Sequence, residues 1–181
     1  MDPRTARGLK LAFLGLLAVY GVAALRNPGA GSILDAVDLA IHETGHLVFG
    51  PFGETIGMAG GTLFQLIVPS VFVGYFVTRR DRYGAAVCLF WVAQNCWNIS
   101  VYVADARAQE LPLVGGGIHD WAYLLGEAGW LQHDAALSRG VHALGLVIFV
   151  AALVTGVQAA LAGRTQASEA LSEAAPERKL I

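Results

Sequence analysis

The sequence predicts an all-α, polytopic membrane protein: a helical bundle of four full spans plus a re-entrant or fifth spanning helix that carries an H-E-x-x-H motif. Three observations predict this fold class. The 181 residues are 55% hydrophobic and only 14% charged, which is too apolar for an ordinary soluble domain. Several apolar runs approach or exceed the roughly 20 residues that cross a bilayer. Within these runs, polar residues recur at helical spacing.

Breakers and caps divide the chain into its predicted elements. The four expected spans cover residues 11–25, 56–77, 83–104 and 140–161. A further helix is predicted at 33–50, where Ser32 can cap the first turn, and a short helix at 121–131, with Asp120 as its N-cap. Residues 1–163 form one membrane-embedded domain, and 164–181 form a polar, disordered tail. The first run also resembles a cleavable signal peptide, and we interpret it as a retained span.

The basic residues predict an orientation in the membrane. If the 33–50 helix enters and leaves on one side, nine of the 12 basic residues lie on one side of the bilayer and three on the other. If that helix spans fully, the division is 7 to 5. The positive-inside rule favours the first arrangement, with cytoplasmic N- and C-termini and a motif helix that opens away from the cytoplasm. The net charge of -2 gives no indication of a nucleic-acid partner.

The H-E-x-x-H motif is His42-Glu43-Thr44-Gly45-His46. In a helix, His42 and His46 lie one turn apart on the same face, so two neutral imidazoles can share one metal ion, usually Zn²⁺. Glu43 lies beside them, where its carboxylate can move a proton between water and a leaving amine. Because ionisable residues are costly within apolar segments, this group indicates a functional site. A pair of helix histidines in a polar seam is the alternative.

A catalytic zinc site needs a third protein ligand, and the sequence offers three candidates. His119 is the first, because a glycine-rich connector at 111–117 can bring it to the site and it has no evident structural role. Asp105, at the end of a polar stripe on the 83–104 helix, is the second. Asp120 is the third, since it also suits a helix N-cap.

Other polar residues are candidates for supporting roles. Asp38 lies four residues before His42 and can accept its second N–H, although a helix N-terminus favours an aspartate there in any case. Gln65 and Asn98 are amides in apolar helices that can contact a substrate or transition state, or can simply join two helices.

The motif and the following span resemble the site-2 protease family of intramembrane zinc metalloproteases, most nearly its short, divergent members. The residues that carry the resemblance are 42–46 and the pattern Gly60-Gly61-Thr62-x-x-Gln65-x-x-x-Pro69. It implies His42 and His46 as zinc ligands, Glu43 as the general base, and peptide-bond cleavage within or beside the membrane. The family takes its third ligand from a Leu-Asp-Gly element, which this chain lacks. Its members generally work towards the cytoplasmic side, opposite to the charge-based prediction.

The sequence therefore predicts a membrane-embedded zinc metalloendopeptidase, a hydrolase that cleaves a membrane-protein or peptide substrate in contact with the lipid bilayer. One alternative is a non-catalytic membrane zinc protein that acts as a sensor or scaffold. Another is a metal-free bundle whose polar stripes pair with each other. Glu43 favours the enzyme, because a purely structural metal site has no need of a carboxylate beside its ligands.

Overall fold

The computed structural model describes residues 2–114 and 117–173, and every regular element in these two ranges is a helix. The all-α prediction is therefore confirmed. The elements follow along the chain as α1 (Pro3–Arg26), α2 (Ile33–Phe49), η1 (Gly50–Phe52), α3 (Glu54–Thr78), α4 (Arg82–Ala104), α5 (Asp120–Glu127), η3 (Leu131–His133) and α6 (Asp134–Glu173).

Four helical segments are long and apolar enough to cross a membrane: α1, α3, α4 and Leu131–Ala162, which comprises η3 and most of α6. The shortest, α4, has 23 residues. At 1.5 Å per residue it is about 35 Å long, against about 30 Å of bilayer hydrocarbon. Large apolar side chains such as Val19, Val71 and Val147 are exposed on α1, α3 and α6. By length and composition, the four predicted spans are confirmed.

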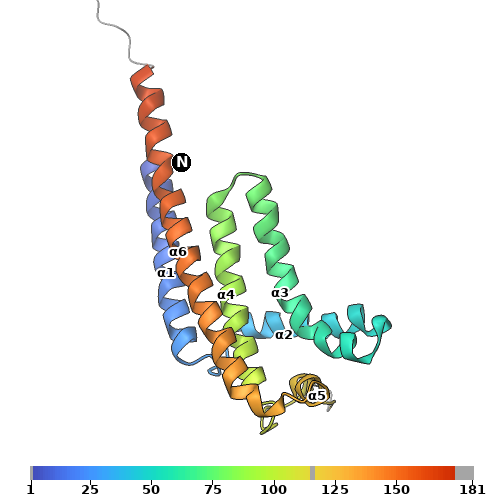
Figure 1. Ribbon diagram of the computed structural model, residues 1–181. Helices are drawn as coiled ribbons and strands as arrows, with labels where there is room; N and C mark the ends of the chain where they lie inside the picture. The colour runs from blue at the N-terminus through green and yellow to red at the C-terminus, as the bar shows by residue number, and fades with distance from the viewer. Residues whose placement is uncertain (1, 115–116, 174–181) are drawn as a thin grey trace, which may run out of the picture.

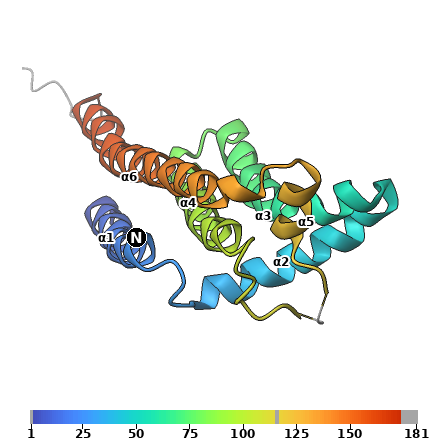
Figure 2. The ribbon, with the colours of Figure 1, turned by 60° about the horizontal axis from the view of Figure 1, so that its bottom comes forward.

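Helix α2, which carries the H-E-x-x-H motif, is not among these four segments. It has 17 residues and lies across one end of the bundle, at a steep angle to α3 and α4 (Figure 1, Figure 2). The sequence predicts that this helix is either re-entrant or a fifth full span. No fifth full span is seen in the part of the chain that the structure describes. The start of α1 and the turn between α3 and α4 lie at the opposite end of the bundle (Figure 1).

Helix α4 packs against both α3 and α6 and supplies most of the core. One face of α4 presents Phe90, Ala93 and Trp97 to Phe149 and Ala152 of α6. Its other face carries polar side chains towards α2 and α3, including the buried Gln94. Helix α4 therefore separates an apolar half of the molecule from a polar half.

The crossing of α2 over α3 depends on glycines. A Cβ atom on Gly45 would strike the backbone oxygen of Gly60, and one on Gly60 would strike the backbone of Gly45. A Cβ on Gly61 would strike the imidazole ring of His42. The two backbones therefore lie in contact, and the His42 ring lies directly against the backbone of α3. Small residues permit this close approach in membrane helices.

The C-terminal helix is longer than the sequence predicts. A disordered tail is expected from residue 164, whereas α6 continues as a helix to Glu173. The first proline after residue 134 is Pro176, and alanine, glutamine and glutamate in this stretch favour a helix. The rest of the expected tail, residues 174–181, lies outside the described residues, as do Gly115 and Gly116 of the predicted connector.

Candidate metal centre

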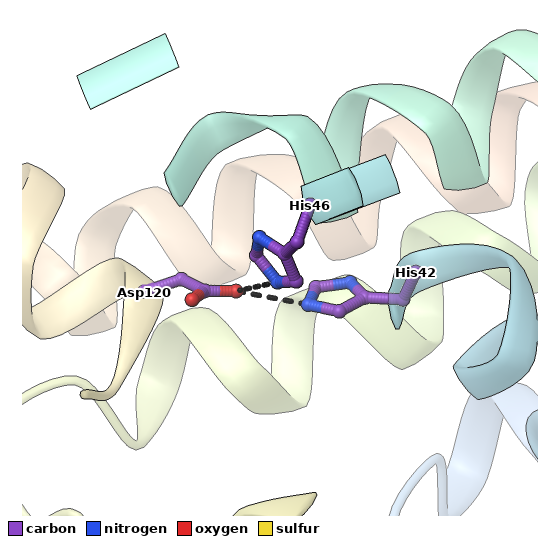
Figure 3. A group of neighbouring side chains, drawn as sticks. All are labelled: His42, His46 and Asp120. Atoms are coloured by element: carbon purple, nitrogen blue, oxygen red, sulfur yellow. Dashed lines mark hydrogen bonds and ion pairs between the residues drawn. The ribbon is translucent and has the colours of Figure 1, made fainter. Parts of the chain in front are cut away.

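The two motif histidines lie on one face of α2, as their spacing predicts. The helix begins with Ser32 as its N-cap, whose hydroxyl accepts a hydrogen bond from the backbone N–H of Asp35 at 3.2 Å. One turn separates His42 from His46, and their ring centroids are 4.9 Å apart. The Nε2 atoms of both rings point to the same place (Figure 3).

The third side chain at this place belongs to Asp120, the first residue of α5. Its Oδ2 atom lies 2.9 Å from Nε2 of His42 and 3.2 Å from Nε2 of His46 (Figure 3). The three potential ligand atoms lie within 4.8 Å of one another. His42 and Asp120 are buried, and His46 is partly exposed. This group could hold a metal ion, and two imidazoles with one carboxylate are a donor set that suits zinc.

The other ring nitrogens of both histidines have acceptors. Nδ1 of His46 lies 2.8 Å from the backbone oxygen of Gly57, and Nδ1 of His42 lies 3.2 Å from Oε1 of Gln65. A carbonyl oxygen only accepts hydrogen bonds, so Nδ1 of His46 donates, and Nε2 is the ring nitrogen left for a metal. The same holds for His42 with the amide oxygen of Gln65. Both rings therefore present the nitrogen that a metal requires.

Glu43 lines a pocket of about 410 Å³ together with His42, His46, Asp120 and Tyr102. It is half-buried, because it follows His42 on a different face of α2. The predicted general base is therefore next to the candidate metal site and in contact with space that a substrate can enter.

A second pocket of about 290 Å³ adjoins the first and shares His42, Glu43 and Tyr102 with it. Most of its remaining wall is apolar, and it continues to the amides of Gln65 and Asn98. Glu43 and His42 thus lie between two hollows rather than at the end of one.

In the structure the third candidate ligand is Asp120 and not His119. This corrects the prediction from the sequence, in which His119 is the first candidate and Asp120 the third. His119 is the N-cap of α5, and its Nδ1 accepts the backbone N–H of Ala122 at 3.2 Å. Its Nε2 lies 3.3 Å from Oδ2 of Asp105, and only 1% of its surface is exposed. The two neighbours exchange their predicted roles: the histidine caps the helix, and Asp120 is free to face the imidazoles.

Asp105 also lies outside the candidate metal group. Its carboxylate accepts the backbone N–H groups of Glu110 and Leu111 at 2.9 and 3.0 Å. These bonds close the turn after α4, and the contact with His119 ties that turn to α5. Asp105 therefore positions the loop that precedes Asp120.

Asp38 does not accept the N–H of His42 as suggested by their spacing. It is fully buried, and its Oδ1 accepts the indole N–H of Trp91 on α4 at 2.8 Å. Gln65 occupies the expected position beside Nδ1 of His42 instead. The side chain of Gln65 donates to Oδ1 of Asn98 at 2.8 Å, so the amides of these two residues are engaged with each other.

The sequence indicates no role for two groups at the site, the hydroxyl of Tyr102 and the backbone oxygen of Gly57. The hydroxyl of Tyr102 accepts the backbone N–H of Asp120 at 3.2 Å, and its ring lies 4.2 Å from that of His119 between centroids. Tyr102 lies three residues before Asp105 in the sequence, but this spacing gives no indication of its contact with Asp120. The backbone oxygen of Gly57 orients His46, and no side-chain pattern can reveal a backbone acceptor.

The surroundings of His42 also affect its charge. Burial lowers its pKa, but the hydrogen bond and the negative charge of Asp120 outweigh that effect, so the pKa lies above its ordinary value. Below that pKa, a metal ion that binds at Nε2 must displace a proton.

No family model matches the chain, and the comparisons find no similar curated protein and no similar solved structure.

Proposed function

We propose that this chain is a membrane-embedded zinc metalloendopeptidase. One observation carries the proposal: Glu43 lines the same pocket in which His42, His46 and Asp120 converge. Three donor atoms from protein side chains leave a coordination position open, which distinguishes a catalytic zinc site from a structural one. A carboxylate beside such a site can act as a general base in hydrolysis.

In this proposal His42, His46 and Asp120 would hold the metal. Zinc bound there would act as a Lewis acid that makes water a better nucleophile and polarises the peptide carbonyl. Glu43 takes the proton from the attacking water and gives it to the nitrogen of the departing amine. Tyr102 lines the same pocket, and its O–H can donate a hydrogen bond to a developing negative charge, because its oxygen already accepts from the backbone of Asp120.

The pockets favour an apolar peptide as the substrate. Apart from two prolines, the aliphatic and methionine side chains along the two pockets are Leu39, Met58, Ile99, Val101, Leu111, Leu113, Val114 and Ile118. A peptide substrate that passes Glu43 through both pockets would place its apolar residues on both sides of the bond to be cleaved. A membrane protein or a peptide near the bilayer has this composition.

The distribution of basic residues supports an orientation. Six of them, at positions 4, 7, 10, 79, 80 and 82, belong to the end of the bundle opposite α2 and α5. Arg26, Arg107 and Arg139 belong to the other end. By the positive-inside rule we place the start of α1 in the cytoplasm, together with the C-terminal part of α6, which lies at the same end (Figure 1). The site then opens away from the cytoplasm.

The test is a cleavage assay with detergent-purified protein and a mixture of fluorescence-quenched peptides that carry apolar residues around the reporter bond. We expect cleavage by the wild type in the presence of zinc. The Glu43→Gln variant should bind zinc equally but cleave at least about 100-fold more slowly, because it lacks the general base. Equal rates would contradict the mechanism. Bound zinc without cleavage by either protein would instead support a sensor or scaffold.

A further inference from the structure

A chain of hydrogen bonds leads from the start of α2 to His42 through two other helices. Asp35 accepts the side-chain N–H of Asn98 at 3.1 Å, and Asn98 accepts the side-chain N–H of Gln65 at 2.8 Å. The oxygen of Gln65 then lies 3.2 Å from Nδ1 of His42. Residues from α2, α4 and α3 are thus linked in series, and the series ends on a candidate metal ligand.

The direction of this chain follows from the chemistry of its first member. A carboxylate can only accept hydrogen bonds, so Asn98 must turn its N–H towards Asp35 and its oxygen towards Gln65. Gln65 must then turn its own N–H towards Asn98 and its oxygen towards His42. Because the oxygen of Gln65 cannot donate, Nδ1 of His42 must carry the proton. Asp35 lies in the first turn of α2, where the partial positive charge of the helix N-terminus stabilises a carboxylate.

We propose that Asp35 is a positioning residue that, through Asn98 and Gln65, keeps the proton of His42 on Nδ1 and its Nε2 lone pair available to the metal. This inference rests on the proposed metal site. The side chain of Asp35 does not touch the metal group, and the effect passes through the orientation of two amides. An amide alone beside His42 would not suffice, because it can present either its oxygen or its N–H to the ring.

The neighbouring histidine shows why such a device is needed at one ring and not at the other. His46 faces the backbone oxygen of Gly57, which is an acceptor in every state of the protein. His42 faces a side-chain amide, which has both a donor and an acceptor end. Its ring lies against Gly61, so the backbone of α3 limits its movement. The orientation of the Gln65 amide therefore decides whether Nδ1 of His42 carries a proton, and Asp35 decides that orientation.

The test compares the zinc affinity of the full chain, purified in detergent, by competition with a chromophoric chelator. Asp35→Asn keeps the shape but allows the whole chain of amides to reverse, and a reversed chain would place the proton on Nε2 of His42. We expect zinc to bind about tenfold more weakly, as is typical when a partner behind a metal ligand is lost.

A second substitution should restore the direction. In the double variant Asp35→Asn/Asn98→Asp, the carboxylate lies at position 98, one step closer to His42 in the series of hydrogen bonds. It still accepts from Gln65, so the oxygen of Gln65 again faces His42. We expect a zinc affinity within about threefold of wild type. Gln94→Leu is the matched control: Gln94 is also buried and donates to the same oxygen of Asp35 at 2.8 Å, but it lies outside the path to His42. It should leave the affinity unchanged.

A spectroscopic measurement reads the tautomer itself. In metal-free protein with ¹⁵N-labelled histidine, Nδ1 of His42 should show a one-bond coupling to a proton in the wild type and in the double variant. Asp35→Asn should lose or weaken that signal.

The outcomes separate this inference from the proposed function. Zinc binding with equal affinity in wild type and Asp35→Asn would overturn the inference and leave the proposed function standing. Equal weakening in the single and double variants would show a structural effect and would also overturn it. A folded wild type that binds no zinc would overturn both.

Discussion

The two halves of the molecule use glycine for opposite purposes. In the core half, formed by α1, α4 and α6, glycines make room for large side chains: Gly21 lies against the ring of Phe149, and Gly145 against the indole of Trp97. In the site half, formed by α2, α3 and α5, Gly45 and Gly60 bring two backbones into contact. The core half gains apolar packing from its glycines, whereas the site half gains short distances between polar groups.

Both halves contain buried side-chain atoms that have no hydrogen-bond partner among the described residues, for example Nε1 of Trp97 in the core half and Oγ1 of Thr62 in the site half. Such an unpaired group costs about 1–3 kcal/mol. The candidate ligand His42 differs, because both of its ring nitrogens have oxygen partners, on Gln65 and Asp120. A site that depends on the direction of hydrogen bonds needs the groups at its ligands paired.

The largest expected effect on zinc binding distinguishes Asp120 from His119, its neighbour at the start of α5. Asp120→Ala removes a proposed ligand and should weaken zinc binding by more than about 100-fold, since even the partners behind a ligand change affinity by 10–100-fold. His119→Asn keeps an N-cap acceptor and should retain zinc. Zinc content per chain after dialysis measures both. Loss of zinc from His119→Asn, with α5 intact by amide exchange, would return His119 to the ligand set.

A matched pair of glycine substitutions tests the comparison between the halves. Gly45→Ala should separate α2 from α3, destabilise the protein by about 1–3 kcal/mol and weaken zinc binding, because both histidines lie on α2. Gly145→Ala should destabilise the protein by a similar amount through the displaced Trp97, yet leave the zinc affinity of the folded protein unchanged.

Thermal unfolding and zinc competition, carried out on the same samples, measure these two quantities. Gly74→Ala is the control, because a Cβ atom at this position in α3 meets nothing within 4 Å. Equal losses of zinc affinity in Gly45→Ala and Gly145→Ala would show that the two halves are not independent.

A smaller effect concerns pH. Because Asp120 holds the pKa of His42 above its ordinary value, zinc must displace a proton below that pKa, and its affinity should fall by up to about tenfold per pH unit as the pH decreases. The metal-free protein should show the opposite sign: the His42–Asp120 pair stabilises it at low pH, and this contribution is lost as the pH rises through the pKa of His42. Zinc competition and unfolding between pH 5 and 8 test the two signs. An Asp120→Asn variant should lose the stabilisation of the metal-free protein at low pH, because it lacks the carboxylate that pairs with His42.

The sequence predicts the helices of this protein well because their signals are local. Apolar runs gave the four spans, and Ser32 gave the start of α2. The i, i+4 spacing placed His42 and His46 on one face, as the structure confirms. The end of α6 was missed, because a polar composition suggested disorder where the residues still favour a helix.

The third candidate ligand was harder to predict because it depends on one residue of register at the start of α5. His119 and Asp120 are adjacent, and either side chain can cap a helix. The residue at which the first turn of α5 begins decides which of the two side chains caps the helix and which one faces α2. The partner of His42 was missed for a related reason. Asp38 is near in sequence, whereas Gln65 reaches His42 only through the close crossing that Gly45 and Gly60 permit.

The most direct test of the central claim is the zinc content of detergent-purified wild type and of His46→Ala, measured by elemental analysis on folded, monodisperse samples. The account predicts about one zinc per wild-type chain and none in the variant. A folded wild type without zinc would contradict it, as would a His46→Ala variant that retains the full amount.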